Sequence, residues 1–150
     1  MPVLVSRKAP GSPELSSRVV KQMAERMLAE LKIESAELSL LLTDDAGIHR
    51  LNREHRGKSS PTDVLSFPLM DPDDEQFGTL EQGAIGDVVI SIDTAQRQAD
   101  RSGHDLVEEV RRLLAHGVLH LLGYDHETDV EEAEMEAATT RLIRASQGPY

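Results

Sequence analysis

The spacing of apolar residues along the chain predicts four strands and about five helices. Between residues 14 and 32 apolar side chains recur every three to four positions, which is the spacing of an amphipathic helix. The runs at 38–43 and 85–92 are apolar almost throughout and have the length of buried strands. The predicted strands are 2–7, 38–43, 63–67 and 85–92, and the predicted helices are 14–32, 45–55, 93–101, 106–121 and 130–145.

Residues that interrupt helices and strands fall between these elements. Proline and glycine end the first strand at 9–13, and Pro68 stops the third strand. The segments 57–61 and 70–82 are rich in polar residues and turn formers, which predicts surface loops. Neither an internal repeat nor a linker long enough to divide two domains is present. The pattern predicts one α+β domain over residues 1–150, with a small mixed four-stranded sheet packed with about five helices.

The composition limits which side chains could bind a metal and indicates the compartment in which the protein is expected. The chain has no cysteine, so a transition metal would have to be held by imidazole and carboxylate groups. A chain without disulfides also fits a reducing cytosol. No run approaches the roughly 18 apolar residues that a membrane span requires, and the N-terminus lacks the apolar core of a signal peptide. We therefore expect a soluble, cytoplasmic protein without a membrane partner.

The net charge of -11 disfavours binding of nucleic acid over the whole surface, because that binding depends on Lys and Arg neutralising phosphates. We do not expect DNA as a partner. Any contact with RNA would have to be local. The best basic cluster is formed by Arg50, Arg53, Arg56 and Lys58. Within it, Arg53 and Lys58 are candidate substrate-binding residues.

Three histidines near the C-terminal end of the fourth helix form a candidate metal site. His116 and His120 are four residues apart, so on a helix they lie on one face and reach a common ion. Gly123 can take the left-handed conformation that ends a helix and turns the chain back. His126 could then complete a three-histidine zinc site, whose fourth position would hold water. The alternative is that these histidines only decorate a helix end.

The spacing also matches the zinc-peptidase motif H-E-x-x-H-x-x-G-x-x-H, with one departure. Gly117 stands where the peptidase has the glutamate that acts as general base. A metal at this site would still act as a Lewis acid. Such a site suits an anionic substrate, for which stabilisation of charge matters more than removal of a proton.

The chain resembles the YbeY family of bacterial endoribonucleases, also called ribosomal RNA maturation factors. The resemblance rests on three segments, 56–68 (RGKSSPTDVLSFP), 86–91 (GDVVIS) and 116–126 (HGVLHLLGYDH). It implies a zincin-like fold and one zinc per chain on His116, His120 and His126. It also implies cleavage of single-stranded ribosomal RNA during maturation of the 3′ end of the small-subunit RNA and in ribosome quality control. The implied partners are the ribosome or small-subunit proteins.

The resemblance further implies that Arg56 is a functional arginine. Its planar guanidinium matches two phosphate oxygens and could stabilise the charge of a phosphorane-like transition state. A salt bridge with Asp63 or Asp87 is the structural alternative. His55 departs from the family, since we expect tyrosine or phenylalanine there, and this change concerns local packing.

The remaining polar residues carry weaker assignments. Asp125 either orients a ligand histidine or forms a turn. For Asp87, inside an apolar strand, we expect a structural hydrogen bond rather than catalysis. We interpret Glu109 as solvated surface. The histidines treated as not binding metal are His49, His55 and His104.

Three functions agree with these patterns: zinc-dependent RNA cleavage, zinc peptide hydrolysis, and a noncatalytic zinc-stabilised factor that binds the ribosome or another protein. Gly117 counts against the second. Cleavage of RNA is the preferred interpretation.

Overall fold

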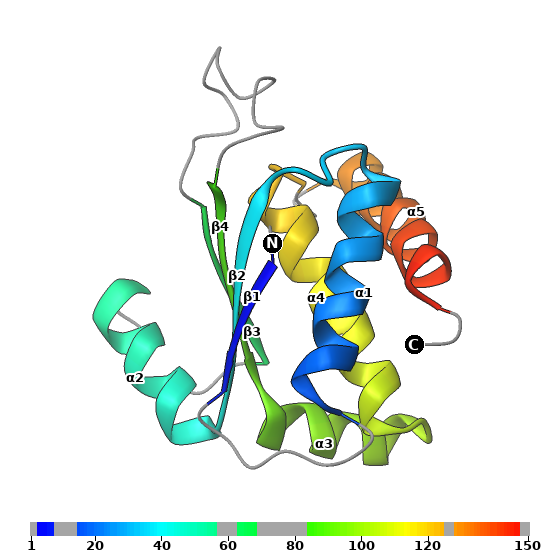
Figure 1. Cartoon of the computed structure of the whole chain (residues 1–150). Coiled ribbons are helices and arrows are strands. Elements are labelled where there is room, and N and C mark those ends of the chain that lie inside the picture. Colours follow the sequence, from blue (N-terminus) through cyan, green and yellow to red (C-terminus); the bar gives the residue numbers. More distant parts are fainter. Residues whose placement is uncertain (1–2, 8–14, 57–62, 69–83, 125–127, 148–150) are drawn as a thin grey trace.

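The structure, a computed structural model, describes residues 3–7, 15–56, 63–68, 84–124 and 128–147 (Figure 1). Within these ranges only the backbone is described for residues 55, 56, 68 and 84. The strands are β1 (Val3–Arg7), β2 (Glu37–Thr43), β3 (Val64–Pro68) and β4 (Ala84–Ser91). The helices are α1 (Ser17–Glu30), α2 (Asp45–Arg56), α3 (Ile92–Ser102), α4 (Leu106–Leu121) and α5 (Asp129–Ser146).

The predicted fold class is confirmed, and each predicted strand and helix is present within a few residues of its predicted ends. The strands form one mixed sheet in the order β1-β2-β4-β3. Strands β1, β2 and β4 are parallel, and β3 pairs antiparallel with β4. The predicted breaker cluster at 9–13 and the predicted loops at 57–61 and 70–82 lie outside the described residues.

Helices cover the two faces of the sheet unequally (Figure 1). Helices α1, α4 and α5 lie on one face, and α2 packs on the other against β3 and β4. Successive side chains of a strand point to opposite faces. Leu40 and Val88 therefore enter the large core under α1, α4 and α5, while Val89 joins a small cluster with Ile48 of α2. This arrangement makes α4 a central, firmly packed helix.

Asp44 and Asp45 fix the start of α2. Asp44 caps the helix, since its Oδ1 accepts a hydrogen bond of 2.8 Å from the Gly47 N–H. The Asp45 carboxylate accepts hydrogen bonds of 2.6 Å from the hydroxyls of both Ser91 and Thr94. These contacts tie α2 to the junction of β4 and α3.

None of the helices in the described ranges combines the length and the apolar character needed to cross a bilayer.

Candidate functional site

Helix α4 carries the candidate site on one of its faces. Arg112, His116 and His120 follow one another at intervals of four residues, slightly more than one helical turn, so they lie along the same side. The opposite side is fixed in the core, where Leu114 and Val118 are fully buried. The rigid packing of α4 therefore sets the positions of both histidines.

The turn after α4 determines the tautomer of His120. Gly123 has a φ of 93°, the left-handed conformation predicted from sequence. Its N–H donates to the His120 carbonyl, and the Tyr124 N–H donates to the Leu119 carbonyl, which is the Schellman pattern of helix termination. The Tyr124 carbonyl then lies 3.1 Å from Nδ1 of His120. Because a carbonyl only accepts, Nδ1 carries the proton and the lone pair of the ring is on Nε2.

His116 is held in the neutral form that a metal ligand requires. Burial lowers the pKa of His116, and the positive charge of the nearby Arg112 guanidinium lowers it further. Asp63 and Glu109 oppose this shift but do not reverse it. An imidazole must be deprotonated to coordinate a metal, so the surroundings of His116 and the tautomer of His120 both fit a zinc ligand.

Two of the three predicted zinc ligands are brought together. His116 and His120 line one hollow of about 220 Å³ between α4 and α5. The third, His126, lies outside the described residues, as does Asp125. Within the described ranges, no group of three or more His, Cys, Asp or Glu side chains has an arrangement that could hold a metal. The three-histidine site therefore stays a prediction.

The predicted RNA-binding residues are described only in part. Arg53 is exposed on α2, across the sheet from α4 (Figure 1). The side chain of Arg56, the last residue of α2, and all of Lys58 lie outside what is described. Their roles, and the alternative salt bridge of Arg56 with Asp63 or Asp87, stay predictions.

The sheet packs so closely against Gly117 that a side chain at this position has no room. A Cβ on Gly117 would lie 2.6 Å from Cγ1 of Val88, which is fully buried. The Gly117 carbonyl also accepts a hydrogen bond of 2.9 Å from the Ser66 hydroxyl on β3. The position that holds the general base in zinc peptidases therefore faces β3 and β4 at close contact, without room for a carboxylate.

The interpretation of Glu109 as solvated surface is wrong. Its side chain is only 4% exposed, and Oε1 lies 2.5 Å from Nε2 of His104. His104 precedes α4 and covers the carboxylate from the junction with α3. Burial of a carboxylate without a partner would be costly, and His104 supplies the partner.

Asp87 lies half-buried in a groove on the α2 face of the sheet, beside Ser39 and Phe67. Among the described residues, none forms a hydrogen bond with the Asp87 side chain, so the structural hydrogen bond expected for it stays a prediction.

Three charged residues of the hollow at His116 and His120 have no role in the sequence-based prediction. Arg112 precedes His116 by four residues on α4, and Glu132 and Glu136 enter from α5. The spacing of Arg112 was the only available signal. The glutamates reach the hollow through packing of α5 on α4, which no local pattern reports.

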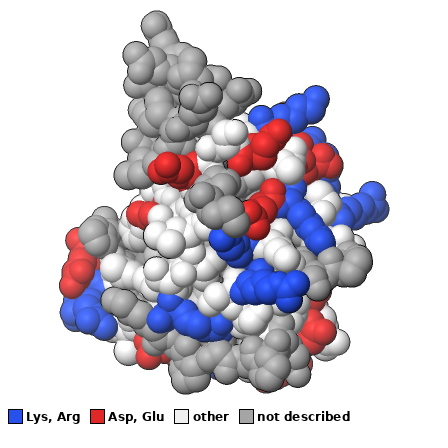
Figure 2. All heavy atoms as spheres, in the orientation of Figure 1, with Lys and Arg blue, Asp and Glu red and all other residues white. Residues whose placement is uncertain are grey.

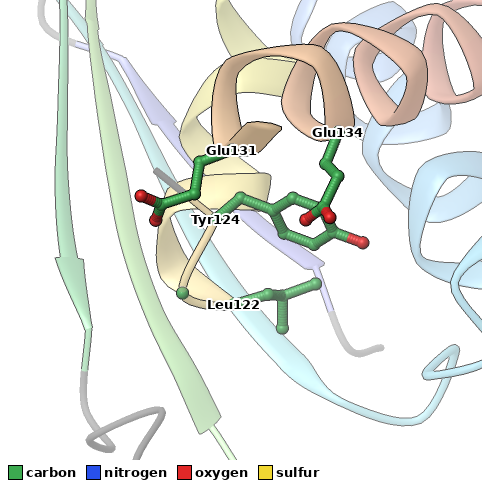
Figure 3. Close-up of a pocket in the computed structure, with 5 residues that line it drawn as sticks. Leu122, Tyr124, Glu131 and Glu134 are labelled. Carbon is green, nitrogen blue, oxygen red and sulfur yellow. The ribbon is translucent and has the colours of Figure 1, made fainter. Parts of the chain in front are cut away.

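A separate hollow lies beyond the turn that follows α4 (Figure 3). It is lined by Leu122, Gly123, Tyr124, Glu131 and Glu134, with the glutamates coming from the first turns of α5. None of these lining residues is basic, so this hollow does not suit a phosphate. Figure 2 shows that basic side chains on the face in view gather in separate groups, one of them over α2. Among the residues described on this face, positive charge is therefore local.

Comparisons with known proteins agree with this architecture. The model of the family described as endoribonuclease YbeY matches residues 7–147. Several proteins named Endoribonuclease YbeY are similar to this chain. The one from Aquifex aeolicus is 51% identical over 75% of this chain and 71% of its own, and the one from Pelotomaculum thermopropionicum is 46% identical over 95% of each. The solution structure of TM1509 from Thermotoga maritima superposes with a TM-score of 0.67 at 25% identity, covering 96% of this chain and 88% of that one. The chain therefore belongs to the endoribonuclease YbeY family.

Proposed function

We propose that this protein is a zinc-dependent endoribonuclease that cuts single-stranded RNA. Its proposed role is maturation of the 3′ end of small-subunit ribosomal RNA and ribosome quality control in the cytoplasm. The observation that carries the proposal is the pairing of His116 and His120 in one hollow with Arg112, in a chain of this family. Two imidazoles suited to metal binding and a guanidinium suited to phosphate fit a phosphodiester substrate better than a neutral one.

His116, His120 and His126 are the proposed ligands of one zinc ion per chain. When bound, zinc supplies a Lewis acid for a phosphoryl oxygen and lowers the pKa of its water toward about 7. The chain prepares the ligands in two ways. The Tyr124 carbonyl holds the ring of His120 in the tautomer with Nε2 unprotonated, and burial keeps His116 neutral.

The proposed task of Arg56 is to bind the phosphate under attack. Asp63, which follows Arg56 by seven residues in the sequence, lines a hollow together with His116. A guanidinium donates two parallel hydrogen bonds to phosphate oxygens and opposes the charge that develops on them. Arg53 and Lys58 are proposed to hold the RNA strand further from the reaction, and small-subunit ribosomal proteins to present it.

Peptide hydrolysis is disfavoured by the geometry at Gly117. The nearest replacement for the peptidase base would have to come from another element, because the Val88 side chain occupies the space beside this position. A noncatalytic, zinc-stabilised factor that binds the ribosome remains the second candidate. The net charge of -11 favours it, since an acidic protein is a weak binder of free RNA.

A circular single-stranded RNA tests the proposal, because it has no ends and only an endonuclease can open it. We expect the zinc-loaded protein to convert the circle to linear products and to leave a fully double-stranded RNA intact. The His116→Ala variant should leave both intact. An unopened circle in the presence of bound zinc would favour the noncatalytic candidate.

A further inference from the structure

A second hollow adjoins His116 on the side away from α5. It measures about 260 Å³ and lies between α3 and α4. Arg112 and His116 line both this hollow and the one that contains His120. The two hollows therefore meet at these side chains, and a strand whose reacting phosphate lies at the histidines has a neighbouring space along α4.

The acidic residues of the second hollow are bonded within the protein. Asp63 accepts hydrogen bonds from the Val64 N–H at 2.8 Å and from Nε2 of Gln98 at 3.2 Å. Glu109 is buried against His104. Because both carboxylates have donors of their own, they leave less negative potential at the opening than their formal charges suggest.

Two basic residues also line this hollow, and their pairing differs from that of the carboxylates. Arg101 comes from the last turn of α3 and Arg112 from α4, and both side chains are exposed. In the described part of the chain neither forms an ion pair with Asp or Glu. Arg101 also stabilises the C-terminal end of α3 through the helix dipole. That explanation does not extend to Arg112, which lies in the middle of α4.

We propose that Arg101 and Arg112 form a binding subsite for the backbone phosphate of the RNA nucleotide next to the one that is cut. Two guanidinium groups from different helices hold one phosphate through charge-assisted, bidentate hydrogen bonds. Ser102, which lines the same hollow, adds a hydroxyl donor. The subsite rests on the proposed function, and it locates the path of the strand across His116 toward α3.

Salt dependence of binding tests the subsite without relying on cleavage. Each phosphate contact that is lost reduces the slope of log K against log salt by about 0.7 for a single strand. The probe is a 2′-O-methylated RNA ten nucleotides long, checked for integrity on a gel after titration. The zinc-loaded proteins to compare are wild type, Arg101→Gln, Arg112→Gln, the double variant and Arg112→Lys. Arg141→Gln is the matched control, since Arg141 is exposed on α5 and lines none of these hollows.

We expect the double Gln variant to lose about 0.7 from the slope, because the subsite holds one phosphate, and each single Gln variant to lose part of that. When the slope is smaller by 0.7, raising the salt from 50 to 200 mM weakens binding about 2.6-fold less than it does in wild type. Arg112→Lys should keep the slope because it keeps the charge, and Arg141→Gln should match wild type. A wild-type slope in the double Gln variant would overturn the subsite while leaving the proposed function intact. Failure of the wild-type protein to bind the probe would overturn both.

Discussion

Replacement of Gly117 by alanine should destabilise the protein, although alanine is the better helix former. The new Cβ would lie 2.6 Å from Cγ1 and 3.2 Å from Cγ2 of Val88, and 3.3 Å from Cγ2 of Val64. Favourable carbon contacts lie at about 3.5–4.0 Å. Val88 cannot turn away easily, because its β-branched side chain is stiff and fully buried in the core.

The expected size of the effect is the difference between two opposing contributions. Overpacking of a core typically costs about 1–3 kcal/mol, whereas alanine gains about 0.8–1.0 kcal/mol over glycine inside a helix. We therefore expect a net loss of about 1 kcal/mol in the free energy of unfolding. For a chain of this length that lowers the melting temperature by about 2–4 °C.

Thermal or urea unfolding of four proteins separates the two contributions: wild type, Gly117→Ala, Val88→Ala and the double variant. In the Val88→Ala background the closest methyl groups are absent, so Gly117→Ala should become neutral or stabilising. A Gly117→Ala protein that melts above wild type would refute the close packing of α4 on β4. So would an equal loss of stability in both backgrounds.

Three further predictions concern the metal, a pH-sensitive contact and catalysis. Purified protein should carry about one zinc per chain by elemental analysis, and alanine at His116, His120 or His126 should strip it, while His49→Ala should not. Full occupancy in the triple-alanine variant would rule out the site. Burial raises the pKa of Asp45, but hydrogen bonds from Ser91, Thr94 and Arg97 outweigh it and hold the pKa below 3.8. Because this carboxyl has a lower pKa in the folded than in the unfolded state, its stabilisation is fully present above the unfolded pKa and is lost as the pH falls through the folded pKa. Asp45→Asn should therefore cost about 1–2 kcal/mol of unfolding free energy at pH 6 and progressively less below about pH 4. Urea unfolding over that pH range measures this cost, with Asp100→Asn as control. A stability difference between wild type and Asp45→Asn that grows at low pH would contradict the prediction. Arg56→Ala and Arg56→Lys should retain zinc and melting temperature but lose about 100- to 1000-fold in RNA cleavage, as other preorganised donors do. If Arg56 instead served as a salt-bridge partner, the melting temperature would fall and the rate would not.

The parts of the molecule that depend on neighbouring residues in sequence were predictable. The four-residue interval of His116 and His120 placed them on one helix face, and the need for a left-handed turn at Gly123 is met by its φ of 93°. The mixed sheet also followed from the pattern of apolar runs. In each of these cases, periodicity or backbone conformation within a few residues determines the outcome.

The parts that depend on packing between helices were not predictable. Glu109 was assigned to the surface because nothing in its helix indicates that His104, from the preceding junction, covers it. Arg112 received no role because the hollows on either side of it exist only once α3 and α5 pack against α4. Sequence spacing reports which residues share a face, but not what that face meets.

Titration of zinc into metal-free protein, with RNA cleavage measured on the same samples, tests the central proposal most directly. Zinc should be removed with a chelator, and the loss of metal confirmed by elemental analysis. We predict that the cleavage rate of a single-stranded RNA rises in proportion to bound zinc and levels off at about one ion per chain, while the His116→Ala protein stays inactive throughout. Full cleavage by the metal-free protein, or no cleavage at full zinc occupancy, would contradict the account.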